Sequence, residues 1–396
     1  MLYPREIFLE IKKVISRDEF IILTGARQVG KTSLLIMLKN FLEEKGGICH
    51  YLNLENPDHL KLLDKHPFNI FELFPESKGK QNVFIDEIQY LNDPSSFLKL
   101  LYDSKRDKIK IISSGSSAFY IDKKFKDSLA GRKFLFEIHP LNFDESLVFN
   151  GREDLLKQKN KRLSVHYKER LLDLWQKYLI YGGYPKVVLE EDDEVKRIVL
   201  EEIGSSYVKM DVRDAGIKNT QKYFSLLKIL AAQTGNLLNS QELANTLGMA
   251  HKTVEEYLYV MKKSYQIALI NPFYKNLRKE LTKMPKVYFY DLGLRNFFLG
   301  NYTPIDKRWD KGAYLENIAF REFLREKKTV DRIKFWRTQD KKEVDFVIDD
   351  EAFEIKFESG REKKKKYEQF RRLYPRIKFN FLTYPSFLEK FYNWKL

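Results

Sequence analysis

The sequence contains a single cysteine, six histidines and no long apolar run. Cys49 cannot form a disulfide within the chain, which fits a reducing compartment. No stretch approaches the roughly 18 consecutive apolar residues of a membrane-spanning helix, and the N-terminal MLYPREIFLEIKK lacks the apolar core of a signal peptide. The histidines lack the spacing of zinc ligands. These absences predict a cytoplasmic protein with neither a membrane partner nor a zinc site.

Basic residues outnumber acidic ones in this chain of 396 residues, which has a formal net charge of +15. An excess of this size favours a polyanionic partner, which is a nucleic acid, a phosphorylated ligand or an anionic membrane face. Lys-rich, Cys-poor compositions are also common in heat-adapted proteins, so charge alone does not choose among these explanations. The length allows two to four domains of about 100–200 residues each.

The first part of the chain alternates short apolar runs with helical patterns. Such runs separated by helices predict a parallel sheet that is covered on both faces. Strands are expected at 19–23, 48–53, 82–85 and 110–113, with a helix at 31–44.

A glycine-rich turn, GARQVGKT at Gly25–Thr32, follows the first expected strand and opens the first helix. It matches the phosphate-binding P-loop pattern, in which glycines let backbone N–H groups converge on phosphate oxygens. Lys31 is expected to reach the β- and γ-phosphates of ATP, and the Thr32 hydroxyl to ligate Mg²⁺. The predicted cofactor-binding residues are Gly25, Ala26, Arg27, Gln28, Val29, Gly30, Lys31, Thr32, Ser33 and Asp86.

Two acids end the third expected strand, in NVFIDEIQ at Asn82–Gln89. Asp86 at the carboxyl edge of the sheet is expected to orient the magnesium ion and its waters. Glu87 can polarise the attacking water as the catalytic base.

Three further polar residues are candidates for the same site. Ser114 or Ser116, at the end of the fourth strand, could contact the γ-phosphate or the water, although a plain Ser/Gly turn explains them equally well. Arg132, in LAGRKF, is a candidate charge stabiliser for the γ-phosphate, acting within its own chain or across a subunit boundary of a homo-oligomer. A surface arginine is the alternative.

Helical patterns dominate from about residue 151 to 266, with a turn at Tyr181–Pro185 (YGGYP). Within this region Asn239–Ser264 has the spacing of a helix-turn-helix, with Gly248 at the turn. Such a unit either binds DNA or connects proteins, and Glu255 and Glu256 on its second helix weaken the DNA interpretation.

The C-terminal part predicts three antiparallel strands, at 333–336, 343–348 and 351–357. A two-residue turn at Asp349–Asp350 would place Asp345 opposite Glu354, with Lys356 on the same face. Facing carboxylates repel unless a cation lies between them. With Glu316 from a preceding helix, these acids could hold a second Mg²⁺ or Mn²⁺ for phosphodiester hydrolysis, with Lys356 orienting or activating water. The alternative is a solvated acidic face without metal.

These motifs together resemble archaeal and bacterial AAA-type ATPases that carry a C-terminal domain of unknown function with a PD-(D/E)XK nuclease-like signature. The name-giving proline is absent, because Val344 precedes Asp345. The matching segments are GARQVGKT, VFIDEIQ, SSGSS, LAGR, YGGYP, DLGLRN at Asp291–Asn296, LEN at Leu315–Asn317, FWRT at Phe335–Thr338, EVDFVI and FEIK.

The resemblance implies an α/β multidomain protein: an AAA+-like parallel sheet, a helical lid, a winged helix-turn-helix and a restriction-endonuclease-like α/β domain. The expected boundaries are 1–150 for the ATPase core, 151–218 for the lid or connector, 219–275 for the winged helix and 276–396 for the nuclease-like domain.

Three functions are compatible with these features. The first is an ATP-dependent enzyme that processes nucleic acid, with DNA as its expected partner. The second is a switch ATPase whose C-terminal domain is an inactive binding module. The third is a DNA-binding regulator that reads sequence through the helix from His251.

Overall fold

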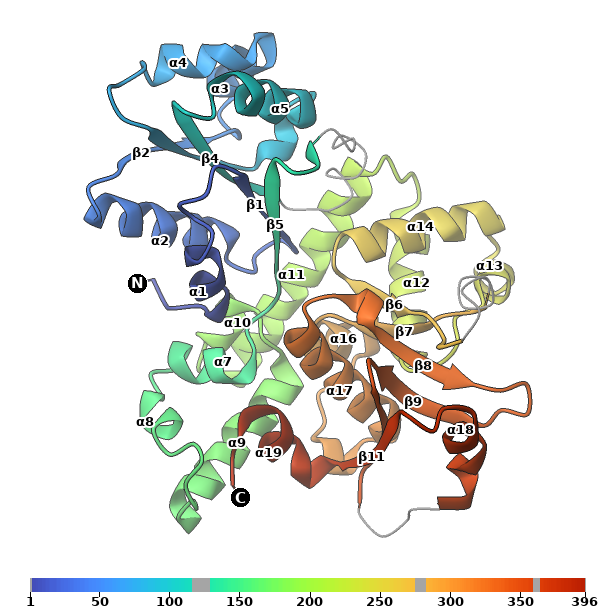
Figure 1. The fold of residues 1–396 in the computed structure, drawn as a ribbon. Helices are drawn as coiled ribbons and strands as arrows, with labels where there is room; N and C mark the ends of the chain where they lie inside the picture. Colours follow the sequence, from blue (N-terminus) through green and yellow to red (C-terminus); the bar gives the residue numbers. More distant parts are fainter. Residues whose placement is uncertain (1, 116–128, 275–282, 359–363, 396) are drawn as a thin grey trace. The chain divides into compact units, whose positions relative to one another are not determined.

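The computed structural model describes residues 2–115, 129–274, 283–358 and 364–395 (Figure 1). The chain divides into two compact units. Unit 1 comprises Met1–Pro140 and Lys263–Tyr265, and unit 2 comprises Leu141–Lys262 and Gln266–Leu396. Among the described residues, no helix combines the length and the apolar character needed to cross a bilayer.

Unit 1 is built on a parallel five-stranded sheet with the order β2-β3-β4-β1-β5. The four strands expected from the sequence are confirmed, each within two residues at its ends. The fifth was missed because β5 is an edge strand whose side chains are mostly half-buried, so it lacks a continuous apolar run. The strands are β1 Phe20–Gly25, β2 Ile48–Asn53, β3 Gln81–Asp86, β4 Ile109–Gly115 and β5 Lys133–Ile138.

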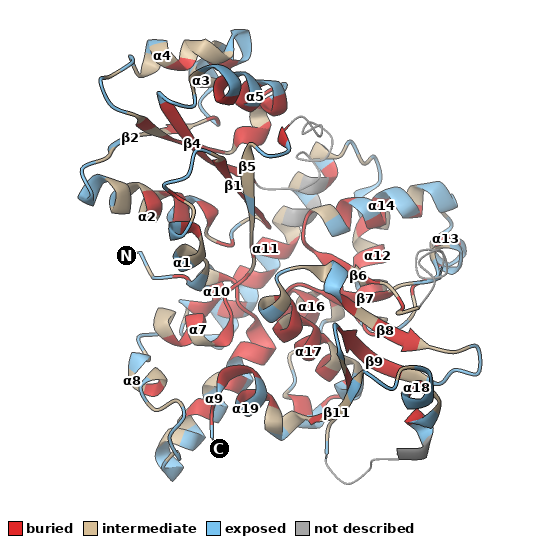
Figure 2. Ribbon diagram, viewed as in Figure 1, coloured by how far each residue is buried: buried red, intermediate tan, exposed pale blue. Residues whose placement is uncertain are grey.

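Helices cover both faces of this sheet (Figure 1). Helix α2 covers one face with Leu34, Leu35 and Leu38, and residues of α3, α4 and α5 share one continuous core with the opposite face. Figure 2 shows that β1 and β4 are buried throughout. The helices of unit 1 are α1 Glu6–Lys12, α2 Lys31–Glu44, α3 Pro57–Lys65, α4 Ile70–Leu73 and α5 Pro94–Lys105, with short 3₁₀ turns η1 Pro67–Asn69 and η2 Ile88–Tyr90.

Unit 2 begins with helices, as the sequence predicts. They continue into two helices joined at Gly248, and a two-stranded antiparallel sheet follows. These elements are α7 Phe143–Phe149, α8 Glu153–Leu156, α9 Val165–Tyr181, α10 Pro185–Val188, α11 Asp193–Asp214, α12 Thr220–Ala232, α13 Ser240–Leu247, α14 His251–Lys263, β6 Ile267–Ile270 and β7 Lys286–Phe289.

The rest of unit 2 is a four-stranded sheet with the order β11-β10-β9-β8, packed with helices. The three strands expected from the sequence are confirmed. A fourth, β11, pairs parallel with β10 and was not expected. The elements are α16 Leu292–Leu299, η4 Ile305–Lys307, α17 Lys311–Lys327, η5 Val330–Arg332, β8 Ile333–Arg337, β9 Glu343–Ile348, β10 Glu351–Lys356, η6 Lys364–Tyr367, α18 Glu368–Leu373, β11 Lys378–Thr383, η7 Tyr384–Ser386 and α19 Phe387–Tyr392.

The YGGYP and DLGLRN segments form one buried junction inside unit 2. The Asp291 carboxylate caps α16 by accepting from the Leu294 N–H at 2.9 Å and also accepts from the Gly183 N–H at 2.8 Å. A Cβ at Gly183 would lie 2.1 Å from the Leu141 carbonyl oxygen, and one at Gly182 would lie 2.2 Å from Asp291. Both positions therefore require glycine, because neighbouring atoms lie too close to leave room for a Cβ atom. The two motifs thus have a role in packing within unit 2.

Candidate functional site

The P-loop between β1 and α2 adopts backbone angles that only a glycine-rich turn tolerates. Gly25 has φ 153° and Gly30 has φ 94°, and Gln28 also lies in the left-handed region at φ 61°. A Cβ at Gly25 would lie 2.1 Å from the Ile138 carbonyl oxygen. The loop is thus shaped at both ends by glycine, and its N–H groups stand at the N-terminus of a 14-residue helix.

Lys31 is folded back onto this loop. Its side chain is buried, and Nζ donates to the carbonyl oxygens of Gly25 at 3.0 Å and Ala26 at 2.7 Å. The ammonium therefore lies beside the loop that is expected to hold phosphate. Phosphate oxygens offer it charge-assisted bonds stronger than those from neutral carbonyls.

The residues that are expected to hold magnesium lie together at the end of β3. The Thr32 hydroxyl donates to Asp86 Oδ2 at 2.7 Å, and Ser114 donates to Asp86 Oδ1. The Ser114 hydroxyl also accepts from the Glu87 N–H at 3.2 Å. Ser114 therefore fixes the two acids, whereas Ser116, the other candidate, lies outside the described residues.

Glu87 occupies a strained backbone position. It has φ 56° and ψ 47°, a left-handed conformation that is uncommon for a residue with a side chain. Its carboxylate accepts from the Gln89 side-chain amide. Strain of this kind persists where the surrounding structure enforces it, often at functional sites.

These residues fit ATP and Mg²⁺ by the chemistry of their donors. The loop supplies N–H groups and an ammonium for phosphate, and Thr32 and Asp86 supply hard oxygen ligands of the kind Mg²⁺ prefers. The Thr32 hydroxyl bonds directly to the Asp86 carboxylate, so both oxygens lie close enough to bind one ion.

Two residues of unit 1 were not expected at this site. Tyr51, on β2, donates its hydroxyl to Asp86 Oδ2 at 2.9 Å. Arg5, ahead of α1, donates to the Val29 carbonyl in the P-loop at 3.0 Å and to the His139 carbonyl at 2.9 Å. The sequence gives no local signal for either residue, because the contact of Tyr51 depends on the pairing of β2 with β3.

Replacing Tyr51 by Phe is expected to raise the Mg²⁺ concentration needed for half-maximal ATP hydrolysis by about tenfold, because groups that orient a metal ligand typically contribute 10–100-fold to metal affinity. ATP affinity measured without Mg²⁺ should stay unchanged. A titration of ATPase rate against Mg²⁺ checks this. An unchanged Mg²⁺ requirement would show that Asp86 is held sufficiently by Ser114 alone.

Arg132 lies far from the P-loop. It immediately precedes β5, and its carbonyl accepts from the Phe20 N–H at the start of β1, whereas the P-loop follows the other end of β1. Five residue steps along a strand span about 16 Å. Its guanidinium makes a two-point ion pair with Asp103, at 2.6 and 3.2 Å. This placement excludes action on the γ-phosphate of its own chain and leaves action across a subunit boundary as a proposal.

The C-terminal hairpin has the expected register. Ile348 pairs with Glu351 and Phe346 with Phe353, so the next positions are Asp345 and Glu354. The two acids are 7% and 1% exposed, which contradicts the alternative of a solvated acidic face. Figure 2 shows β9 in the buried colour. The sequence could not reveal this burial, because α17 and α18 come from outside the hairpin.

Two lysine ammonium groups and one backbone N–H partly compensate the negative charge of the two carboxylates. Asp345 Oδ2 accepts from the Ile355 N–H at 2.8 Å. Glu354 Oε1 accepts from Lys356 Nζ at 2.5 Å and lies 3.5 Å from Lys366 Nζ. Within the described ranges, its buried Oε2 has no hydrogen-bond partner. Burial, with the charges of Glu316 and Glu354, raises the pKa of Asp345 well above its ordinary value. The two carboxylates therefore repel each other when both are charged.

Lys356 remains protonated in this arrangement. Burial opposes its charge, but the hydrogen bond and charge of Glu354 raise the pKa of Lys356 above its ordinary value. Of the two expected roles, orientation of water or substrate is favoured over activation of water by a neutral amine.

Glu316 does not share a metal site with Asp345 and Glu354 in this structure. Its Oε2 accepts from Tyr288 at 2.8 Å and pairs with Lys286 Nζ at 3.1 Å. Among the described residues, no group of three or more His, Cys, Asp or Glu side chains is arranged to hold a metal ion. The expected arrangement of three carboxylates around one metal is therefore not formed, because Glu316 is already paired with Lys286.

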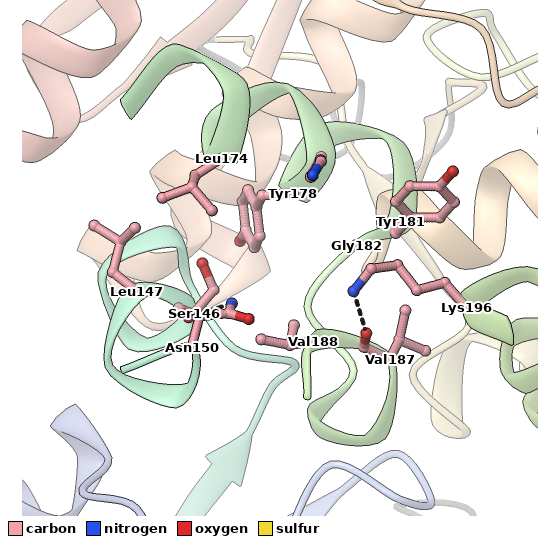
Figure 3. A pocket seen from close by; sticks show the side chains of 11 residues that line it. Ser146, Leu147, Asn150, Leu174, Tyr178, Tyr181, Gly182, Val187, Val188 and Lys196 are labelled. Atoms are coloured by element: carbon pink, nitrogen blue, oxygen red, sulfur yellow. Dashed lines mark hydrogen bonds between the residues drawn. The ribbon is translucent and has the colours of Figure 1, made fainter. Parts of the chain in front are cut away.

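A pocket elsewhere in unit 2 has a structural explanation (Figure 3). It measures about 50 Å³, too small for a nucleotide. Lys196 lines it and donates to the Val187 carbonyl at 2.8 Å, the bond marked in Figure 3, and to the Glu190 carbonyl. The ammonium thereby satisfies carbonyl groups around the end of α10.

Family models match most of the chain in three segments. A model described as an AAA domain matches residues 17–147. Two domains of unknown function, DUF8612 and DUF4143, match residues 172–304 and 311–389.

The similar curated proteins are uncharacterized. One from Haemophilus influenzae is 30% identical over 359 residues, which cover 87% of this chain and 84% of that protein. One from Methanocaldococcus jannaschii is 28% identical over 359 residues, which cover 87% of this chain and 77% of that protein.

Similarity to solved structures is low. The replication initiator DnaA bound to AMPPCP and single-stranded DNA aligns with a TM-score of 0.34 at 17% identity, over 66% of this chain and 88% of that chain. The Aeropyrum pernix Orc1 protein in complex with DNA aligns with a TM-score of 0.30 at 10% identity, over 75% and 92%. Scores this low carry no conclusion about this chain. The P-loop, the sheet order and the matches to families and relatives show that the chain belongs to the AAA-type ATPases that combine an AAA domain with the C-terminal domain of unknown function DUF4143.

Proposed function

We propose that this protein hydrolyses ATP in unit 1 and acts on nucleic acid, with DNA as the expected substrate, through the carboxylate cluster of unit 2. The P-loop and Lys31 bind and orient the triphosphate. Mg²⁺, when bound, neutralises charge that develops on the phosphates. Thr32 and Asp86 hold the ion, and Tyr51 and Ser114 hold Asp86.

Glu87 is the proposed catalytic base. It follows Asp86 directly, and the Ser114 hydroxyl bonded to both residues fixes their relative orientation. The Glu87 carboxylate would accept the proton of the attacking water, and its bond from Gln89 would have to loosen as it does so.

The observation that carries the nucleic-acid half is the buried pair of Asp345 and Glu354. Lys356 bonds to Glu354 Oε1, and Glu354 Oε2 has no hydrogen-bond partner in the part of the chain that the structure describes. These oxygens fit Mg²⁺ or Mn²⁺, which would act as a Lewis acid on a phosphodiester. Asp345 and Glu354 would ligate the ion, and Lys356 would orient the phosphate or water.

The arrangement of elements supports the finer fold assignments that we propose. Helices α13 and α14 followed by the β6–β7 sheet have the layout of a winged helix, and α17 with the β8–β11 sheet has that of a nuclease-like domain. The proposed boundaries remain 1–150 for the ATPase core and 151–218 for the lid. The boundary between the winged helix, which starts at 219, and the nuclease-like domain moves from 275 to beyond Phe289, because β7 pairs with β6.

The test is a paired assay of ATP hydrolysis and metal-dependent cleavage of single- and double-stranded DNA and RNA. Glu354→Ala is expected to abolish cleavage and keep hydrolysis, whereas Lys31→Ala should abolish hydrolysis and keep basal cleavage. Wild-type protein that cleaves no nucleic acid with Mg²⁺ or Mn²⁺ would refute the nuclease role.

A second candidate function is a switch ATPase whose unit 2 binds a partner without catalysis. It is favoured by the exposed face of α14, where His251 bonds to Ser240 at 2.9 Å and lies 3.6 Å from Glu255. A histidine engaged in this way, next to an acid, is poorly placed to contact phosphate or bases. Nucleotide-dependent self-association without salt-sensitive DNA affinity would support this function over the first.

A further inference from the structure

The carboxylate cluster of unit 2 contains a buried lysine that the nuclease resemblance does not supply. Lys286 is 1% exposed, and its Nζ lies 3.1 Å from Glu316 Oε2 and 2.6 Å from Glu343 Oε1. It comes from β7, in the two-stranded sheet, whereas Glu316 lies on α17 and Glu343 on β9 of the four-stranded sheet. Elements of two separate sheets therefore meet at this ammonium.

The surroundings hold Lys286 in its charged form. Burial opposes the charge, but Glu316, Asp345 and Glu343 together raise the pKa of Lys286 above its ordinary value. Glu343 pairs on its other side with Arg337. Lys286 thus places its positive charge beside Glu316 and Asp345, the same carboxylates that would attract a divalent cation.

Glu316 is saturated on the side that faces Lys286. Its Oε2 accepts from both the Lys286 ammonium and the Tyr288 hydroxyl. In contrast, the buried Glu354 Oε2 has no hydrogen-bond partner among the described residues. A buried carboxylate oxygen left in this state is costly and points to a missing cation or donor at the Asp345–Glu354 end of the cluster.

We propose that Lys286 is an internal counter-ion that competes with a divalent cation for the cluster, so that metal binds tightly only when the ammonium withdraws from Glu316. This inference rests on the proposed metal-binding role of Asp345 and Glu354. A shift of β7 relative to α17 by a few ångströms would remove one charge from the site and free the third carboxylate. The two-stranded sheet would thereby control the metal affinity of the neighbouring four-stranded sheet.

The experiment is calorimetric titration of the full-length protein with Mn²⁺ alone, without nucleotide. Lys286→Met is expected to bind Mn²⁺ about tenfold more tightly than wild type, because removing a neighbouring positive charge favours a divalent cation. Lys196→Met is the matched control, since Lys196 is also a buried lysine of unit 2 but bonds to backbone carbonyls. Its Mn²⁺ affinity should equal that of wild type. Adding Asp345→Asn to Lys286→Met should remove the tightened site, which separates it from any binding in unit 1.

A second measurement keeps the test valid if Lys286→Met weakens folding. The double variant Lys286→Met/Glu343→Gln removes one positive and one negative charge, so the net charge of the cluster is preserved. Its melting temperature should rise more with Mn²⁺ than that of wild type, because Glu316 is no longer paired with an ammonium and a ligand that binds more tightly stabilises the folded state more.

The outcomes distinguish this inference from the proposed function. Equal Mn²⁺ affinity in wild type and Lys286→Met would overturn the counter-ion role and leave the metal site intact. Weaker binding in a folded Lys286→Met protein would also overturn it and make Lys286 a residue that positions Glu316. No Mn²⁺ binding by any variant would overturn both the metal site and the inference.

Discussion

Glu87→Gln is expected to lower kcat for ATP hydrolysis by a factor of about 10²–10⁴, the usual contribution of a positioned general base. The amide keeps the size of the side chain and its capacity to accept from Gln89, but it cannot take a proton from water. Nucleotide affinity should remain near the wild-type value, because the P-loop and Asp86 are unchanged. Steady-state hydrolysis and equilibrium binding of ATP measure the two effects separately.

A matched control for this substitution lies in the same unit. Glu55→Gln makes the same chemical change at an exposed position, where the carboxylate accepts from the Asn53 side-chain amide. Its hydrolysis rate should be unchanged. A Glu87→Gln protein that hydrolyses ATP at the wild-type rate would remove Glu87 from the mechanism and direct attention to another base.

Local sequence was sufficient to locate the nucleotide site. The order strand, glycine turn and helix fixes Lys31 at the start of α2, and an apolar run that ends in acids fixes Asp86 at the end of β3. Both features depend only on neighbouring residues. The hairpin register was equally predictable as far as the Phe346–Phe353 pair, next to Asp345 and Glu354, because a two-residue turn and period-two alternation determine which residues face each other.

Features set by strand order or by distant segments could not be predicted in this way. Arg132 looked like a phosphate ligand until β5 placed it at the amino edge of the sheet. Tyr51 reaches Asp86 only because β2 pairs with β3. Lys286 meets Glu316 from a segment thirty positions earlier, on a different sheet. Burial in particular depends on helices that a strand pattern does not contain.

The DLGLRN segment also anchors the helix that carries Glu316. Asp310, the residue before α17, accepts from Arg295 at 2.7 Å and from Arg308 at 2.8 Å. Arg295 and Arg308 side chains are fully buried, and the Asp310 side chain is 2% exposed. Arg308 also lies 4.1 Å from the centre of the Tyr314 ring. One carboxylate therefore bonds to two guanidinium groups inside unit 2.

Asp310→Ala is expected to lower the free energy of unfolding of unit 2 by about 3–5 kcal/mol, because it leaves buried charges without their partner. Burial opposes ionisation, but Arg308 and Arg295 lower the pKa of Asp310 below its ordinary value. The stabilisation is therefore present above the unfolded pKa of about 3.9 and is lost as the pH falls through the lower folded value. The difference between wild type and variant should persist from neutral pH down to about pH 4 and shrink below it. Urea unfolding at several pH values measures this.

The control is Asp103→Ala, which removes the partner of Arg132 from a similar two-point pair at the surface. The Asp103 and Arg132 side chains are 40% and 31% exposed, so water can solvate the arginine that remains. No measurable loss of stability is expected there. Equal effects of the two substitutions would mean that the Asp310 network is open to water in solution. A large effect confined to Asp310→Ala would instead show that the arginine of the DLGLRN motif is retained for folding, and that the position of Glu316 depends on it.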